Sequence, residues 1–285
     1  MTRFAHAAPL EPASTDLRDF VGRHLRLLVL TGAGVSTDSG IPGYRDRDGN
    51  WRRSPPITVQ EFLRSTAARQ RYWARSMIGW PLVTGARPNA AHDALARLES
   101  DGRIGLLVTQ NVDGLHQRAG SAHVLELHGN LRRAVCLDCG TEASRETIQR
   151  RLEADNPDFP NASAAAAPDG DADLTADSLD AFHVPACTRC GGVLKPDVVF
   201  FGDNVPRERV HEAFAALDAA DAMLVVGSSL MVYSGYRFCE HAARTGKPIA
   251  AINLGRTRAD ALFAIKVERP CAEALAALAG LPAPI

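Results

Sequence analysis

Residues 31–45 read Thr-Gly-Ala-Gly-Val-Ser-Thr-Asp-Ser-Gly-Ile-Pro-Gly-Tyr-Arg and follow directly on the apolar run Leu25–Leu30. This order predicts a buried parallel strand that ends in a Gly-x-Gly turn and a helix start. Gly32 and Gly34 have no Cβ atoms to block the close approach of a ligand, and a helix N-terminus offers free N–H groups to a phosphate. The pattern alone leaves two interpretations open, a phosphate site or an ordinary strand-to-helix turn.

The glycine pattern differs from that of dehydrogenases in two ways. Thr37 stands where their third glycine would be. The segment then continues into Ile41-Pro42-Gly43-Tyr44-Arg45 rather than into a second strand that ends in an acid. Both differences argue against a hydride-transfer site and favour another use of a dinucleotide.

The composition is that of an ordinary soluble globular protein. The chain has 285 residues, of which 46% are hydrophobic and 23% charged, and its formal net charge is −1. This balance gives no electrostatic reason to expect nucleic acid or a membrane surface as a partner. No apolar run is long enough to span a membrane, and the N-terminal residues lack the apolar core of a secretory signal. We therefore expect a cytoplasmic protein whose six cysteines are kept reduced.

Four apolar runs have the composition of buried strands in a parallel sheet. They are Leu25–Leu30, Ile104–Thr109, Met223–Val226 and Ile249–Ile252. Each is followed by a turn of polar and small residues: Gly32-Ala33-Gly34, Gln110-Asn111-Val112-Asp113, Gly227-Ser228-Ser229 and Asn253-Leu254-Gly255. Helical patterns such as Ala90–Glu99 and Arg209–Ala219 lie between the runs. The expected fold class is therefore α/β, with a Rossmann-like parallel sheet. Because ligands bind at the carboxyl ends of such strands, the four turns together predict one long cleft, although each alone fits an ordinary turn.

Two stretches do not fit the parallel sheet and predict a smaller second domain. Residues 46–88 contain three tryptophans and a helical pattern around Val59–Trp73, which indicates a helical module. Residues 135–195 contain four cysteines and an acidic, low-complexity segment, 153–180, which we expect to be a solvated loop. The predicted division is 1–45, 89–134 and 196–285 for the sheet domain, 46–88 for the helical module and 135–195 for a zinc-binding module.

Two pairs of cysteines, Cys136-Leu-Asp-Cys139 and Cys187-Thr-Arg-Cys190, form C-x-x-C knuckles that are each followed by glycine. Two such knuckles present four thiolates to one tetrahedral metal ion, which is typical of a zinc site. A redox motif and disulfides are the alternatives, but two separate redox motifs would be unusual, and a reducing compartment disfavours disulfides. Since no fifth ligand stands nearby, we expect the zinc site to be structural and closed.

Polar side chains with catalytic potential follow the second apolar run. Asn111 and Asp113 stand two residues apart at the end of a strand, where a donor and an acceptor together could bind a carboxamide. His128 stands between the predicted cofactor turn and the cysteine module and is followed by glycine, which makes it a candidate general base. A structural role for this histidine is the alternative.

These motifs, taken in order, resemble those of the sirtuin family of NAD-dependent protein deacylases. The resemblance covers the chain from about Asp19 to the last strand, and it includes Gly32-Ala33-Gly34-Val35-Ser36, Gly40-Ile41-Pro42-x-Tyr44-Arg45, Gln110-Asn111-Val112-Asp113, His128-Gly129, both knuckles and Lys195–Gly202. Gly114-Leu115-His116, the stretch Arg71–Arg75 and the long insert between the knuckles are similar to class II of the family. The resemblance implies a Rossmann-like domain and a smaller zinc-ribbon plus helical domain, with NAD and an acyl-lysine peptide in the cleft between them.

The resemblance also implies roles for individual residues. Gly32, Ala33, Gly34 and Ser36 would hold the pyrophosphate, with Tyr44 and Arg45 closing over it. Gln110, Asn111, Val112 and Asp113 would bind the ribose and nicotinamide. The turns Gly227-Ser228-Ser229 and Asn253-Leu254-Gly255 would meet the adenosine half, with the Cys271 backbone near the adenine. The segment Val198-Val199-Phe200-Phe201-Gly202 would pair with the substrate peptide as an added strand.

The chemistry so implied consumes NAD as a co-substrate. The acyl oxygen would attack the ribose carbon as nicotinamide leaves, and His128 would then remove a proton from a ribose hydroxyl that attacks the resulting imidate. The products would be free lysine, nicotinamide and acyl-ADP-ribose, and the catalytic residues would be His128, Asn111 and Asp113. Two positions depart from the family pattern, since Gly43 replaces an acid and Asp203 replaces the common glutamate.

The acyl group is indicated only by Tyr72 and Arg75. They stand at i and i+3 of a predicted helix, share a face, and could reach a carboxylate at the end of an acyl chain. A Tyr-x-x-Arg pair of this kind is typical of acid-acyl preference in another class of the family. The hypothesis is a preference for longer or acidic acyl groups over acetyl, and the alternative is that both residues brace the helical module.

The expected partners are acyl-lysine proteins, with neither nucleic acid nor a membrane as a partner, and the expected state is a monomer. Two other functions share the NAD residues and stay open. One is a mono-ADP-ribosyltransferase that modifies protein, and the other is a non-catalytic, NAD-sensing zinc scaffold.

Overall fold

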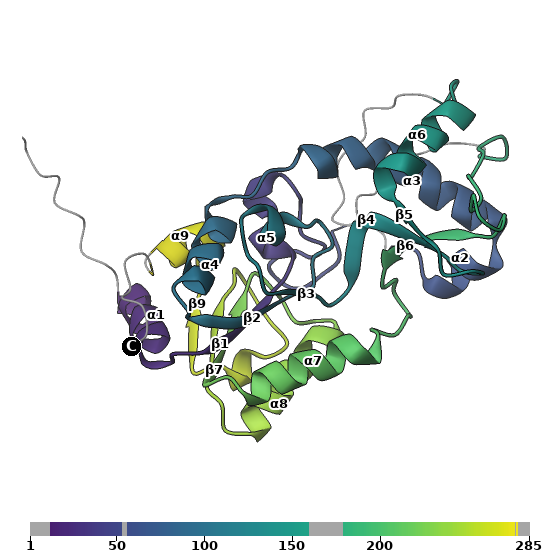
Figure 1. Ribbon diagram of the computed structural model, residues 1–285. Helices are drawn as coiled ribbons and strands as arrows, with labels where there is room; N and C mark the ends of the chain where they lie inside the picture. The colour runs from purple at the N-terminus through teal and green to yellow at the C-terminus, as the bar shows by residue number, and fades with distance from the viewer. Residues whose placement is uncertain (1–11, 53–55, 160–178, 277, 279–285) are drawn as a thin grey trace, which may run out of the picture.

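The computed structural model describes residues 12–52, 56–159, 179–276 and 278, which form a larger and a smaller unit (Figure 1). The larger unit contains a six-stranded sheet in the order β3-β2-β1-β7-β8-β9, and every pairing in it is parallel. The strands are β1 (Leu27–Thr31), β2 (Ile104–Thr109), β3 (Val124–Glu126), β7 (Ala222–Val226), β8 (Ile249–Ile252) and β9 (Ile265–Val267). The expected α/β class with a Rossmann-like sheet is confirmed. The sequence did not predict the edge strands β3 and β9, which are too short for a clear pattern.

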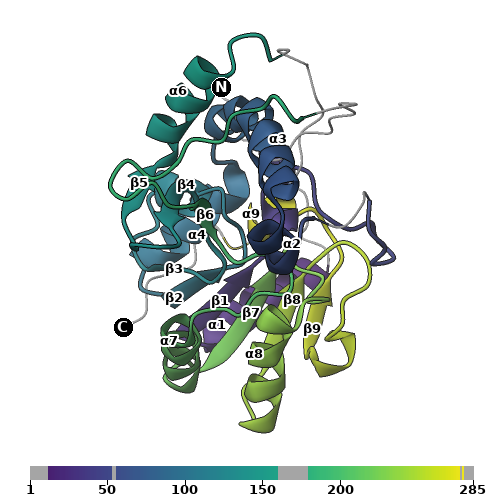
Figure 2. The ribbon, with the colours of Figure 1, turned by 90° about the vertical axis from the view of Figure 1, so that its right-hand side faces the viewer.

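Helices cover both faces of this sheet (Figures 1 and 2). One face carries α1 (Pro12–Arg23), α4 (Ala90–Ser100) and α9 (Cys271–Ala276), and the other carries α7 (Arg207–Asp218) and α8 (Tyr233–Arg244). In β1, Leu27 and Val29 belong to the first core, whereas Leu28 and Leu30 belong to the second. Because both faces are buried, the central strands are apolar up to the threonines that end β1 and β2, which is why the sequence revealed them.

The segment around β1 differs from the expectation at both ends. The strand begins at Leu27 and not at Leu25, whose side chain is exposed. After Thr31 come two short 3-10 turns, η1 (Ala33–Val35) and η2 (Thr37–Ser39), where a helix start was predicted. Gly40 ends the second turn in the left-handed region (φ 84°), and Pro42 follows without an N–H group. The predicted helix start at this turn is therefore present only as two short 3-10 helices.

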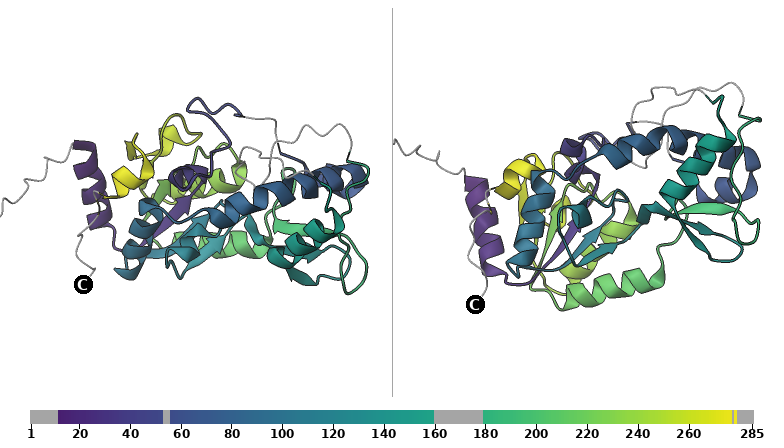
Figure 3. Two further views of the ribbon diagram at one scale, coloured as in Figure 1. Left: turned by 90° about the horizontal axis from the view of Figure 1, so that it is seen from above. Right: turned by 45° about the horizontal axis from the view of Figure 1, so that its top comes forward.

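The smaller unit combines a three-stranded antiparallel sheet with helices. β4 (Gly129–Cys136) pairs with β5 (Glu142–Ser144) and with β6 (Leu194–Val198). The helices are α2 (Val59–Arg64), α3 (Thr66–Gly85) and α6 (Arg145–Asp155), and they share one apolar core with the sheet. The helical pattern predicted around Val59–Trp73 is two helices, because Ser65 has extended backbone and caps α3 with its side chain. Figure 3 shows the smaller unit beside the parallel sheet, so that the molecule is elongated.

β4 and β6 connect the two units. Residues 129–134 and 196–198, expected in the sheet domain, run in the antiparallel sheet. Gly129 (φ 85°) pairs with Val198 at one end of these strands, and a Cβ atom there would overlap the Asp197 carbonyl oxygen. The exact division of the chain into 1–45, 89–134 and 196–285 against 46–88 and 135–195 stays a prediction.

Two short elements complete the larger unit, α5 (Leu115–Arg118) and η3 (Asp260–Leu262). The acidic segment predicted as a solvated loop lies mostly outside the described residues, which omit 160–178. Among the residues that the structure describes, no helix is both long and apolar enough to cross a membrane.

Candidate active site

A cavity of about 700 Å³ lies at the carboxyl ends of the central parallel strands. All four predicted turns contribute to its lining, through residues 32–34 after β1, 110–112 after β2, 227–229 after β7 and 253–254 after β8. Cys271, at the start of α9, also lines it. The four turns therefore form one cleft, as the sequence predicted.

The two glycines of the β1 turn are required by the neighbouring β7 turn. Gly34 N–H donates to the Gly227 carbonyl (2.8 Å), and Gly32 N–H donates to the Val226 carbonyl (3.1 Å). A Cβ on Gly32 would lie 2.8 Å from the Ser228 Cβ, and one on Gly34 would lie 2.9 Å from the Gly227 Cα. Neither fits, so the glycines permit contact between two backbone turns, a requirement that the sequence did not reveal. Their phosphate-binding role stays a prediction.

Ser36 and Asp113 lie behind the cavity wall and not in it. Ser36 Oγ donates to Asp113 Oδ2 (2.8 Å) and accepts from Asn111 Nδ2 (3.0 Å). The other Asp113 oxygen accepts from the Leu115 backbone N–H (2.9 Å), and burial raises the pKa of this carboxyl. Of these residues only Asn111 lines the cavity. The pair therefore supports Asn111 from behind. Gly255, the last residue of the β8 turn, is likewise outside the lining.

Tyr44 and Arg45 lie in a loop at the cavity that is fixed by aromatic contacts. The Arg45 guanidinium stacks on the Trp51 ring at 4.0 Å and donates through Nη1 to the Gly49 carbonyl (2.7 Å). The Tyr44 and Trp51 rings contact the Phe201 ring, with centroid distances of 6.3 and 5.4 Å. Since Phe201 follows β6, this loop joins the region after β1 to the smaller unit across the cavity.

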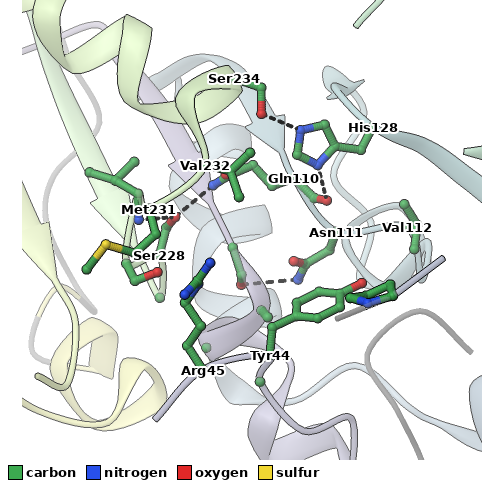
Figure 4. Close-up of a pocket in the computed structure, with 18 of the residues that line it drawn as sticks. Tyr44, Arg45, Gln110, Asn111, Val112, His128, Ser228, Met231, Val232 and Ser234 are labelled. Carbon is green, nitrogen blue, oxygen red and sulfur yellow. Dashed lines mark hydrogen bonds between the residues drawn. The ribbon is translucent and has the colours of Figure 1, made fainter. Parts of the chain in front are cut away.

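His128 is held at both ring nitrogens (Figure 4). Nδ1 lies 3.0 Å from the Gln110 backbone carbonyl, which can only accept, so Nδ1 carries the proton. Nε2 therefore has the free lone pair and accepts from the Ser234 hydroxyl (2.8 Å). Burial lowers the pKa of His128 to about 4, against the opposing effect of the Gln110 carbonyl. The imidazole is neutral at pH 7, with an unprotonated Nε2 at the cavity wall.

A chain of hydrogen bonds continues from His128 to the β7 turn. Gln110 accepts from His128 through its carbonyl and donates through Nε2 to the Ser228 hydroxyl (2.8 Å). Sequence reasoning missed Ser234, because it stands 106 residues from His128 and no local pattern marks it.

Most, but not all, of the expected substrate residues line the cavity. The segment 198–202 lines the cavity, and its Val199 N–H donates to the His128 carbonyl (2.9 Å). Tyr72 also lines the cavity and packs against Phe200, with ring centroids 5.3 Å apart. Arg75 is not among the described residues of the lining. The structure therefore joins only one member of the predicted Tyr-x-x-Arg pair to the site.

Four cysteine thiols gather in the smaller unit, apart from the cavity. The Sγ atoms of Cys136, Cys139, Cys187 and Cys190 all lie within 4.8 Å of one another. Cys136 and Cys190 are 3.5 Å apart, and Cys139 and Cys187 are 3.8 Å apart. A tetrahedral site with Zn–S bonds of about 2.3 Å requires sulfur separations of about 3.8 Å. The four side chains thus fit the closed, structural zinc site that the sequence predicted.

The chain matches the model of the Sir2 family over residues 32–234. It belongs to the Sir2 family. This sirtuin is 61% identical over 269 residues to an NAD-dependent protein deacetylase of Xanthomonas campestris pv. campestris, with 94% of this chain and 92% of that protein covered. It is 61% identical over 260 residues to a protein of the same name from Bordetella bronchiseptica, with 91% and 95% covered.

Solved Sir2 structures share this fold. A complex described as Sir2-p53 peptide-NAD+ matches with a TM-score of 0.75 and 30% identity, covering 92% of this chain and 95% of that one. A structure described as Sir2 bound to acetylated peptide matches with a TM-score of 0.73 at the same identity and coverage. The predicted resemblance to sirtuins is confirmed, whereas the finer assignment to class II stays a prediction.

Proposed function

We propose that this sirtuin removes acyl groups from lysine side chains of proteins and consumes NAD, giving nicotinamide, acyl-ADP-ribose and free lysine. The observation that carries the proposal is the neutral His128, whose unprotonated Nε2 lies at the wall of a cavity at the strand ends. The names of the bacterial relatives and the Sir2 complexes with NAD and acetylated peptide support it.

The cavity can accept a dinucleotide together with an acyl-lysine. Its volume of about 700 Å³ lies within the range of roughly 300–1,000 Å³ that is usual for ligand pockets. The β1 turn with Tyr44 and Arg45 would hold the pyrophosphate, and the turns after β7 and β8 would hold the adenosine half. The segment 198–202 would pair with the peptide, which would bring its lysine past Tyr72 and Phe200.

Asn111 is oriented to bind the nicotinamide carboxamide. Its Nδ2 donates to the Gly32 carbonyl (3.2 Å) and to the Ser36 hydroxyl (3.0 Å). Because the amide nitrogen is used in this way, the side-chain oxygen is the atom left to accept from the carboxamide. Asp113 would act through Ser36 to hold this orientation.

His128 would act as the general base at Nε2. When Nε2 takes the proton of a ribose hydroxyl, positive charge develops on the ring. The Gln110 carbonyl then stabilises that charge, since it already accepts from Nδ1–H. The four cysteines would hold one structural zinc ion, which stabilises the smaller unit and takes no part in the proton transfer.

The proposal extends to a monomer that acts in the cytoplasm on acyl-lysine proteins. For the acyl group we retain the preference for longer or acidic chains over acetyl, which now depends on Tyr72 because Arg75 is outside the described lining. A turnover panel in which acetyl-lysine is faster by about tenfold, or 1.4 kcal/mol, would contradict this preference.

The test is nicotinamide release with NAD and a panel of acylated lysine peptides. We expect release only with an acylated peptide. In the steady state over many turnovers, His128→Ala should lose at least about 100-fold, since general-base catalysis at the later step contributes that much. His123→Ala is the matched control, because His123 is an exposed histidine of the same unit, paired with Glu99 and outside the lining. Release without any acyl peptide would favour ADP-ribosyl transfer, and the absence of release would favour an NAD-sensing scaffold.

A further inference from the structure

Ser234 contacts the candidate base directly. Its hydroxyl oxygen lies 2.8 Å from His128 Nε2, and its side chain is buried in the first turn of α8 (Figure 4). Both residues line the cavity, so the contact forms part of the wall that a substrate meets.

The direction of this hydrogen bond follows from the other side of the ring. The Gln110 carbonyl fixes the proton on Nδ1, so Nε2 is unprotonated and the Ser234 hydroxyl must be the donor. Nε2 has one lone pair. In this structure Ser234 occupies the lone pair that a general base uses.

The segment 228–234 holds both ends of the hydrogen-bond chain. Ser234 bonds to His128, His128 to Gln110, and Gln110 to Ser228, so the chain begins and ends in one loop. Within this loop Leu230 has a left-handed backbone (φ 56°), is fully buried, and donates its N–H to Ser228 Oγ (3.3 Å). A non-glycine residue keeps such a conformation only where its surroundings enforce it, so the loop holds Ser234 in a defined place.

We propose that Ser234 is a positioning residue for His128, an inference that rests on the proposed function. Its hydroxyl holds the imidazole in the Nδ1–H tautomer and gives up Nε2 to the ribose hydroxyl when the reaction begins. The ribose O–H bond then breaks and its proton moves to Nε2. The oxygen forms a bond to the imidate carbon as the C=N π bond breaks and its electron pair moves onto the cationic nitrogen. Ser234 turns to accept from the new Nε2–H, because a hydroxyl both donates and accepts.

The charges around the ring make this acceptor useful. Arg209 and Arg237 are the charged groups whose fields reach His128, and both disfavour an imidazolium. Arg237 lines the same cavity. Two oxygen acceptors, the Gln110 carbonyl and the Ser234 hydroxyl, would offset this repulsion at the two ring nitrogens.

The kinetic test compares two partial activities in the full chain. Nicotinamide exchange into NAD reports the departure of nicotinamide, which precedes the step of His128, whereas deacylation requires that step. We expect Ser234→Ala to lower the ratio of the deacylation rate to the exchange rate by about three- to tenfold, which corresponds to the contribution of one hydrogen bond. Ser234→Thr, which keeps the hydroxyl, should restore most of the ratio. Ser121→Ala is the matched control, since Ser121 is a buried serine outside the lining whose hydroxyl bonds no described residue.

The second measurement needs no substrate. In two-bond ¹H–¹⁵N spectra of the free protein, His128 should show a protonated Nδ1 and an unprotonated Nε2. The Nε2 resonance should move in Ser234→Ala and return in Ser234→Thr. An Nε2–H tautomer, an unmoved resonance, or an equal fall of exchange and deacylation would overturn the proposal. Failure of the proposed function would look different, because the wild-type protein would then release no nicotinamide with any acylated peptide, or would release it equally well without one.

Discussion

The larger and the smaller unit of this sirtuin are stabilised in different ways. The larger has two apolar cores, one on each face of the parallel sheet, and its strands β1, β7 and β8 are buried throughout. The smaller has one core, in which aromatic and aliphatic side chains of the helices pack around a three-stranded sheet. It also carries the four thiols and a buried arginine, Arg145.

The two units therefore depend on different interactions for their stability. The parallel sheet brings four turns and His128 to one edge through backbone packing, so the chemistry depends on that packing. The smaller unit is too small to bury an equivalent core, and ligation of a metal compensates in such modules. The two units should therefore fail under different perturbations.

The largest expected effect is that of zinc removal. Cys187→Ser should unfold the smaller unit selectively, because structural zinc contributes apparent binding energies of about 10–16 kcal/mol in small metal-binding domains. Hydrogen exchange should rise in β4 and β6 while β1 and β7 stay protected. Cys239→Ala is the control, a buried cysteine of the larger unit with no metal role. Equal loss of hydrogen-exchange protection in both units would contradict the claim that zinc removal unfolds the smaller unit selectively.

The next effect concerns the backbone contact in the larger unit. Gly227→Ala should lower the free energy of unfolding by about 3 kcal/mol or more, because Gly227 has φ 63° and an added Cβ would overlap the Val35 nitrogen. Denaturant unfolding measures the loss. Gly22→Ala in α1, where nothing lies within 4 Å of an added Cβ, should instead raise stability by up to about 1 kcal/mol. A tolerated Gly227→Ala would show that the two turns can separate.

Mild acid should weaken the larger unit through its buried histidines. Burial lowers the pKa of His92 to about 4, of His116 to about 3 and of His128 to about 4. The unfolded chain binds protons below about pH 6.5 and the folded one does not, so stability falls as the pH drops from 6.5 towards 4. Each histidine should lower the free energy of unfolding by about 2 kcal/mol at pH 5 relative to neutral pH. Unfolding at pH 7 and pH 5 should show a smaller drop in His92→Gln, and an unchanged drop would contradict these pKa values.

The smallest expected effect is at Arg145, which joins α3 to α6. Its guanidinium donates to the Ser76 carbonyl (3.0 Å) and to Gln149 Oε1 (2.7 Å), and it lies over the Trp80 ring at 4.7 Å. Arg145→Lys keeps the charge but loses the planar fork and the stacking, which should cost about 1–2 kcal/mol. Arg151→Lys is the control on the same helix, with one exposed bond to the Ala186 carbonyl. Equal losses of stability in the two variants would show that the buried contacts of Arg145 add nothing to the free energy of unfolding.

Much of this architecture could be predicted from the sequence. Continuous apolar runs marked the central strands, and the spacing of Cys136, Cys139, Cys187 and Cys190 marked the zinc site, because both signals are local. The helix start predicted after Thr31 is two short 3-10 helices and not a longer helix, and Gly40 and Pro42 end the segment. Contacts between segments that are far apart in the chain left no pattern in the sequence. The dependence of Gly34 on Gly227 and of His128 on Ser234 appears only when the strands are side by side.

The most direct test of the account is the pH dependence of kcat/KM, which reports the ionisation of the free enzyme. If His128 is a neutral, half-buried base with a pKa of about 4, activity should hold as the pH falls through 6.5 and decline only near pH 4–5. His128→Ala should remove the activity, so that no fall of kcat/KM at acid pH is left to measure. An acid limb at the ordinary histidine value of about 6.5, lost in His128→Ala, would show that the ring is solvated and would contradict the account.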